Sequence, residues 1–136
     1  MKRRAARTVF GLMTFIFLPS GFSAGAQAPS GESSSALYQV LAKYRESSRR
    51  GEHEAAVKTL EKSAEKFNSV NEGLLKLLRG RSFERLLKPN EALAEYTTGL
   101  TLKGPFEAQL RFSFARVAAA QGRSDDAKNA LNLLLA

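Results

Sequence analysis

The chain has 136 residues and a formal net charge of +8 at pH 7, with one histidine and no cysteine. Zero cysteines exclude disulfides, and together with a single histidine they leave little for metal binding or nucleophilic catalysis. The first 28 residues hold four of the 21 basic side chains and none of the 13 acidic ones, so residues 29–136 have a net charge of +4.

The first 28 residues have the three parts of a secretory signal peptide. The four basic residues precede an apolar run at 9–18, and small residues follow up to Ala-Gln-Ala at 26–28. The run is shorter than the roughly 20 residues that cross a bilayer. We therefore expect cleavage after residue 28, with an uncleaved anchor as the alternative, and export to the periplasm of a Gram-negative bacterium or out of the cell.

The remaining chain shows helical periodicity almost throughout. Residues 29–35 are polar and predict a linker. Six helices are then expected at about 36–50, 52–67, 72–86, 89–102, 105–120 and 124–136, with glycine or proline at their junctions. Few stretches alternate as strands do, so we predict an all-α fold.

Three alanines recur at near-equal spacing with the same neighbours. Ala56, Ala92 and Ala127 are 36 and 35 residues apart. A large apolar residue comes four positions after each of them (Leu60, Tyr96, Leu131), and an arginine comes eleven positions before (Arg45, Arg81, Arg116). A fixed period of this length indicates stacked helical hairpins, whereas an irregular six-helix domain with chance spacing is the alternative.

Residues 114–131 give the clearest view of the unit: a small residue, a tight glycine turn, a packing alanine and a large residue one turn later. In this order the chain resembles the tetratricopeptide repeat family over about 36–136, with repeats at about 36–69, 72–103 and 105–136. The resemblance implies a right-handed α-solenoid of three hairpins, in which the alanines lie where paired helices cross. Gly80 and Ala115 would be the matching small residues on the first helices.

Several departures from the family pattern stand out. Lys43 and Arg79 stand where the family prefers an apolar residue. Tyr44 occupies the small position in the first unit, and Leu87 replaces the turn glycine in the second. The period also exceeds the family's length of about 34 residues. We therefore expect the repeat register of the first two units to be less regular than that of the third.

In the resembled family, the first helix of each hairpin lines a concave groove that binds peptides. Carried over, Arg45, Arg81 and Arg116 would lie on this inner face, with Arg49 and Arg85 one turn further along. Guanidinium groups bind carboxylates through paired hydrogen bonds. Apolar contacts would come from Tyr38, Leu41, Leu77 and Phe112. The alternative is that these arginines are solvated or paired within the chain, for example Arg81 with Glu84.

The C-terminal helix offers a second candidate surface, because Leu131, Leu134 and Leu135 are apolar where a stacked array normally has a polar outer side. The residues leave three explanations open: a homodimer, a partner that covers this end, or a chain that is part of a longer array.

No motif predicts catalysis. His53 follows a turn glycine and reads as a surface residue, and a Gly-x-Ser-x-Gly match at 21–25 lies within the expected signal peptide. Neither a phosphate-binding loop nor a dinucleotide-binding glycine pattern is present. We therefore expect no enzyme activity, no metal and no cofactor.

The sequence thus predicts a non-catalytic adaptor or scaffold of the cell envelope that binds a protein or peptide, acidic by preference. A structural subunit docked or dimerised through the C-terminal helix is the alternative, and a binder of polyanions or membrane surfaces is a third hypothesis. We expect no transmembrane helix after signal cleavage. Nucleic acid is not expected, because no run interleaves aromatic and basic residues.

Overall fold

The computed structural model describes residues 31–64 and 67–135, so the expected signal peptide and the Gly-x-Ser-x-Gly match lie outside the described residues. Within these ranges the chain forms six helices and no strand, which confirms the all-α prediction. The helices are α1 (Gly31–Arg49), α2 (His53–Ala64), α3 (Ser69–Arg85), α4 (Pro89–Thr101), α5 (Glu107–Ala120) and α6 (Ser124–Leu135).

Most helix boundaries lie within a few residues of the expected ones, and the largest difference is at α1. This helix begins at Gly31, so residues 31–35 are helical rather than part of a linker. A serine-rich segment has no apolar periodicity, but a helix that has formed from Leu37 onward extends at one hydrogen bond per added residue. Composition alone therefore placed the start too late.

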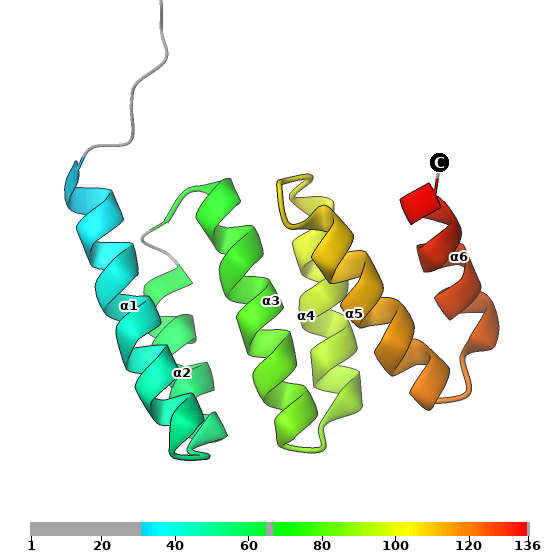
Figure 1. Cartoon of the computed structure of the whole chain (residues 1–136), viewed down its shortest axis with the longest axis horizontal. Coiled ribbons are helices and arrows are strands. Elements are labelled where there is room, and N and C mark those ends of the chain that lie inside the picture. The colour runs from blue at the N-terminus through cyan, green and yellow to red at the C-terminus, as the bar shows by residue number, and fades with distance from the viewer. Residues whose placement is uncertain (1–30, 65–66, 136) are drawn as a thin grey trace, which may run out of the picture.

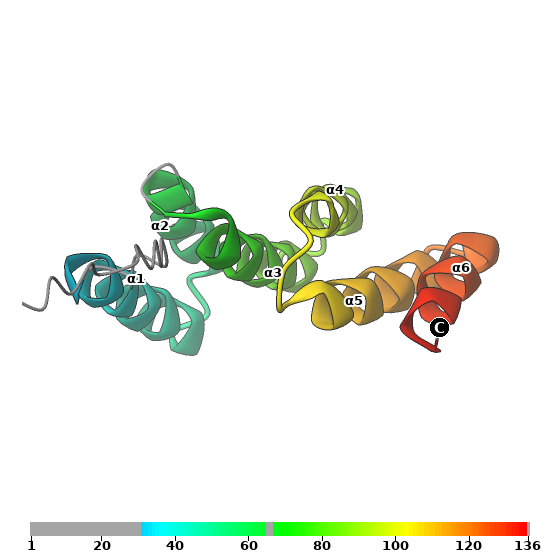
Figure 2. The same ribbon diagram turned by 90° about the horizontal axis from the view of Figure 1, so that it is seen from above.

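The six helices form three successive hairpins, α1–α2, α3–α4 and α5–α6, arranged in a row (Figure 1). Contacts of α2 with α3 and of α4 with α5 join one hairpin to the next. Seen from above, α1, α3 and α5 lie on one side of the row and α2 and α4 on the other (Figure 2). The first helices therefore share one layer, as the hairpin stack requires, while the handedness of the stack stays a prediction.

The same two hydrogen bonds close all three hairpin turns. The N–H groups of Glu52, Lys88 and Arg123 donate to the carbonyls of Ser47, Phe83 and Ala118, each at 2.9 Å. One residue earlier, the N–H groups of Gly51, Leu87 and Gly122 donate to Ser48, Glu84 and Ala119. The φ angles of Gly51, Leu87 and Gly122 are 76°, 57° and 73°. This is the glycine-type helix C-cap, and it repeats with the period of the sequence.

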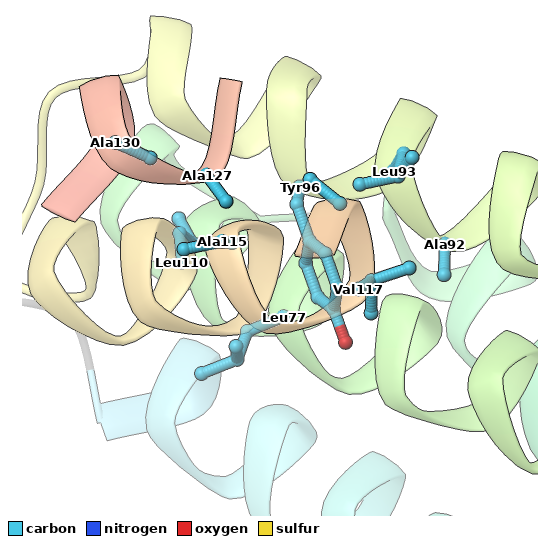
Figure 3. Packing of buried hydrophobic residues seen from close by; sticks show 10 residues of the cluster. Leu77, Ala92, Leu93, Tyr96, Leu110, Ala115, Val117, Ala127 and Ala130 are labelled. Atoms are coloured by element: carbon cyan, nitrogen blue, oxygen red, sulfur yellow. The ribbon is translucent and has the colours of Figure 1, made fainter. Parts of the chain in front are cut away.

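The crossing points of the hairpins are packed as expected. Ala56, Ala92 and Ala127 are buried, and so are Gly80 and Ala115 on the first helices. A Cβ atom at Gly80 would overlap ring carbons of Tyr96, so only glycine lets α3 approach α4 this closely. Figure 3 shows the Tyr96 ring within the core cluster that the second and third hairpins share.

Leu131 is less buried than the equivalent residues of the first two units. The equivalent residues Leu60 and Tyr96 are fully buried, whereas Leu131 is 40% exposed. Leu60 and Tyr96 lie in helices that also contact the next hairpin, but among the described helices α6 contacts only α5 to any extent. One side of α6 therefore has no helix packed against it in the described part of the chain.

A partly buried ion-pair network holds α2, α3 and α4 together. Arg79 of α3 reaches Glu61 of α2 at 3.2 Å and Glu95 of α4 at 2.7 Å, and Lys76 lies 3.5 Å from Glu95. Arg79 stands where the resembled family prefers an apolar residue. Its charge is compensated by carboxylates from both neighbouring helices, which explains why the position tolerates it.

None of the described helices is both long enough and apolar enough to span a membrane.

Candidate binding groove

A polar pocket of about 930 Å³ opens on the layer formed by the first helices. Helices α1, α3 and α5 supply its wall, apart from one residue at the start of α2. The lining residues are Tyr44, Ser48, His53, Arg81, Ser82, Glu84, Arg85 and Arg116. With His53 neutral, this wall has a formal charge of +2, which favours an anionic ligand.

Two arginines of the wall have no carboxylate partner in the described part of the chain. Arg81 and Arg85 are one helical turn apart on α3, and both are exposed. Among the described residues, neither has a carboxylate oxygen within 4.0 Å. Since residues at this spacing lie side by side on a helix, the two guanidinium groups can approach one ligand together.

The third arginine of the wall is already paired. Arg116 of α5 donates from Nη2 to both oxygens of Glu84 on α3, at 2.8 and 2.6 Å. The side chain of Glu84 is 16% exposed and that of Arg116 is 54% exposed. Internal pairing was one alternative for these arginines, and the structure realises it between Arg116 and Glu84 rather than Arg81 and Glu84.

Glu84 also accepts a hydrogen bond from the hydroxyl of Tyr96. Burial, and then the hydrogen bond to Glu84 and its charge, raises the pKa of Tyr96 well above the ordinary tyrosine value. With Tyr96 on one side and Arg116 on the other, the Glu84 carboxylate is engaged by the fold. It therefore lines the pocket without repelling an anion as strongly as an unpaired carboxylate would.

A smaller and more apolar pocket of about 340 Å³ adjoins the first at this ion pair. Both pockets share Glu84 and Arg116, and the second is otherwise lined by Leu87, Pro89, Val117, Ala120 and Gln121. The hairpin turn between α3 and α4 forms one side of it and the last turns of α5 form the other. The candidate site is therefore a cationic pocket with an apolar extension.

The other arginines predicted for the groove lie elsewhere. Arg45 and Arg49 are exposed on α1, but neither lines the pocket. On α1 the wall is formed instead by Tyr44 and Ser48, which are one turn apart. Of the five arginines expected on the inner face, those that line the pocket lie on α3 and α5.

The four predicted apolar groove residues have different environments. Tyr38 and Phe112 are 74% and 58% exposed, and Leu41 is half-buried, but none of the three lines the pocket. Leu77 is 3% exposed and belongs to the core cluster, so its assignment to the groove is wrong. Leu77 and Arg81 are one turn apart, but the leucine packs into the core while the arginine reaches the pocket.

The residues that sequence reasoning missed are Tyr44, Ser48, His53, Ser82 and Glu84. The Oγ atom of Ser48 is buried without a hydrogen-bond partner among the described residues. His53 was expected at the surface and is half-buried in the wall. The one-turn spacing of Tyr44 and Ser48, like that of Arg81 and Arg85, was a signal that could have placed them on one helix face.

At the other end of the molecule, the leucines of α6 are exposed. Leu131 and Leu134 are 40% and 36% exposed, and Leu135 is 88% exposed. These three are spaced so that they share one face of the helix. Only Ala127 and Ala130 of this helix are buried.

In the described ranges, no three acidic or histidine side chains lie close enough together to hold a metal ion. No protein-family model, curated protein or solved structure matches the chain.

Proposed function

We propose that the protein is a non-catalytic adaptor or scaffold that binds an acidic segment of another protein in the cationic pocket. The observation that carries the proposal is the pair Arg81 and Arg85, which have no carboxylate partner among the described residues and lie on the wall of a 930 Å³ pocket. The repeated hairpin turns and buried crossing alanines support a relation to tetratricopeptide repeat proteins.

The chemistry of the wall suits side-chain carboxylates. Two arginines one helical turn apart have Cβ atoms about 6 Å from each other. Their guanidinium groups can each bind a carboxylate of one peptide through paired hydrogen bonds. Tyr44 and Ser48 of α1 line the same pocket. A segment bound here would contact two hairpins at once, which suits a rigid scaffold whose binding surface is formed before the ligand arrives.

Action in the cell envelope depends on the expected signal peptide, which lies outside the described residues. N-terminal sequencing of the protein purified from a periplasmic extract is expected to begin at residue 29. A chain that begins at residue 1 in a membrane fraction would instead support the uncleaved anchor.

The binding proposal can be tested by selecting peptides from a random-sequence display library with the purified protein. We expect the selected peptides to be rich in aspartate and glutamate and to bind Arg81→Glu/Arg85→Glu at least tenfold more weakly. The matched control Lys62→Glu/Lys128→Glu has the same net charge but changes exposed residues that do not line the pocket. Circular dichroism establishes that all three proteins are folded.

Peptides without acidic bias, or equal binding to both double variants, would contradict the proposal. Binding that is lost equally from both double variants, and that falls with salt whatever the peptide sequence, would support the hypothesis of a polyanion or membrane-surface binder.

The exposed face of α6 favours a second candidate function, a structural subunit that docks or dimerises through Leu131, Leu134 and Leu135. Light scattering at micromolar concentration would give the mass of a dimer for the wild type. Leu134→Ser/Leu135→Ser would then be a monomer. A monomeric wild type excludes the homodimer and leaves a different partner or a longer repeat array as the explanation for this face.

A further inference from the structure

Leu87 is the residue of the α3–α4 turn whose presence the fold does not explain. It has a left-handed backbone with a φ of 57°, and its side chain is 87% exposed. The equivalent residues in the other two hairpin turns are Gly51 and Gly122. Among the described residues, Lys103 is the other non-glycine residue with positive φ, and its charged side chain is well solvated.

The leucine is unfavourable to the folded chain in two ways. A side chain with a Cβ atom is strained in the left-handed region, where glycine is not. An apolar side chain that stays in water also contributes no burial energy. The turn needs a left-handed backbone at residue 87 but does not need a leucine there. A residue held in a strained backbone conformation is typical of functional positions. Leu87 therefore points to a contact that is made outside the folded chain.

The surroundings of Leu87 indicate the chemistry of that contact. Leu87 lines the apolar pocket of about 340 Å³ together with Pro89, Val117 and Ala120. This pocket continues into the arginine pocket through the Glu84–Arg116 pair. An occupant of both pockets must present carboxylates at one end and an apolar side chain at the other.

We propose that Leu87 is a specificity residue that docks an apolar side chain of the acidic partner segment, beyond the carboxylates bound at Arg81 and Arg85. The inference rests on the proposed function. It further requires that the ligand carry an apolar residue at a fixed distance from its acidic residues. The strain at residue 87 is retained because glycine there would remove the apolar contact.

The test uses fluorescein-labelled peptides that carry a glutamate pair and a leucine at increasing separation, together with the same peptides with alanine in place of leucine. Leu87→Gly is expected to raise the Tm of the protein by about 4 °C, because it relieves the backbone strain. It is also expected to weaken binding of the best leucine peptide about tenfold, which corresponds to loss of one buried apolar side chain. Binding of the alanine peptides should stay unchanged.

Lys103→Gly is the matched control, because it relieves a similar backbone strain at a residue that lines neither pocket. It is expected to raise the Tm without affecting any peptide. Leu87→Asn, whose side chain tolerates the left-handed region, should reproduce the selective loss of leucine peptides.

The other possible results would contradict the role of Leu87, the proposed function, or both. If Leu87→Gly binds leucine peptides as the wild type does, or weakens leucine and alanine peptides equally, Leu87 is not a specificity residue and the arginine pocket is unaffected. If Arg81→Glu/Arg85→Glu binds these peptides like the wild type, the proposed function itself fails. If no peptide of the series binds the wild type, both proposals are overturned.

Discussion

At the scale of single residues, Glu84 joins the hydrophobic core to the candidate groove. Its carboxylate accepts from the buried Tyr96 hydroxyl on one side and from the half-exposed Arg116 guanidinium on the other. Tyr96 lies in α4 and Arg116 in α5, so this one carboxylate in α3 connects three helices. We infer that it positions Arg116 at the boundary between the two pockets.

Replacing Tyr96 by phenylalanine isolates this connection, because the ring is kept and only the hydroxyl is lost. We expect the free energy of unfolding at pH 7 to fall by about 1 kcal/mol, the usual value of such a hydrogen bond. Chemical denaturation of the wild type and Tyr96→Phe measures the difference. A change below a few tenths of a kcal/mol would show that the hydroxyl contributes nothing to the fold.

The hydrogen bond between Tyr96 and Glu84 predicts that the stability of the protein depends on pH in the alkaline range. The pKa of Tyr96 is raised in the folded protein by burial and by Glu84, so the unfolded chain releases this proton first, near pH 10. The stabilisation is therefore complete below pH 10 and declines above it. Between pH 10 and 11 the wild type should lose about 1 kcal/mol more stability than Tyr96→Phe. Parallel pH profiles would contradict the assignment.

Glu84 also shows why sequence reasoning located the arginines better than their partners. Equal spacing placed Arg81 and Arg116 in one layer of helices, and both line the pocket. The partner of Arg116 is 32 residues away, and which of two nearby arginines reaches a carboxylate depends on side-chain geometry between hairpins. Periodicity carries no information on that choice.

At the scale of helices, small residues set the distances at which neighbouring helices pack. Gly80 of α3 lies against the Tyr96 ring of α4, and Gly99 of α4 lies against Leu110 of α5. Both glycines are buried within helices, where glycine is intrinsically unfavourable compared with alanine. Close packing therefore outweighs helix propensity at these two crossings.

Gly80→Ala tests this directly. The added methyl group would overlap ring carbons of the fully buried Tyr96, so we expect a loss of about 2 kcal/mol of stability, typical of overpacking. Propensity alone predicts a gain of roughly 1 kcal/mol, so the sign of the change decides between the two. Gly104→Ala is the control, since a Cβ there has no neighbour within 4 Å, and its effect should stay within about 0.5 kcal/mol.

The repeated small residues are also the part of the fold that the sequence predicted best. The alanine period anticipated the three crossings, and Leu87 was correctly placed at a turn position although it is not a glycine. The start of α1 was missed, and spacing alone did not distinguish Leu131 from the buried Leu60 and Tyr96. The first depends on helix extension through polar residues, and the second on which helices have a neighbour, neither of which is encoded in spacing.

At the scale of the whole molecule, a single row of hairpins leaves the layer of first helices open to solvent on one side. The cationic pocket lies between α1, α3 and α5 of this layer, and its apolar extension lies at a hairpin turn. Because the pocket wall comes from three hairpins, its shape depends on how they stack. The stacked hairpins thus supply the residues that line this candidate site.

The helix layer on which the candidate site lies could be predicted from the sequence, but the set of residues that line the site could not. Arg81, Arg85 and Arg116 were foreseen, whereas Arg45 and Arg49 lie outside the pocket and Tyr44 and Ser48 form the wall on α1. The first unit departs from the repeat at Tyr44, and in this unit the spacing of the arginines did not predict which side chains line the pocket. A repeat pattern predicts direction only where the units are alike.

A charge-swap titration tests the central claim that Arg81 and Arg85 bind an acidic segment. Anisotropy of labelled glutamate-rich and lysine-rich peptides would be measured with the wild type, Arg81→Glu/Arg85→Glu and the control Lys62→Glu/Lys128→Glu. We expect the wild type and the control to prefer the glutamate peptide, and the Arg81/Arg85 variant to prefer the lysine peptide, by at least tenfold each, or about 1.4 kcal/mol. An unchanged preference in the Arg81/Arg85 variant, or the same reversal in the control, would contradict the claim.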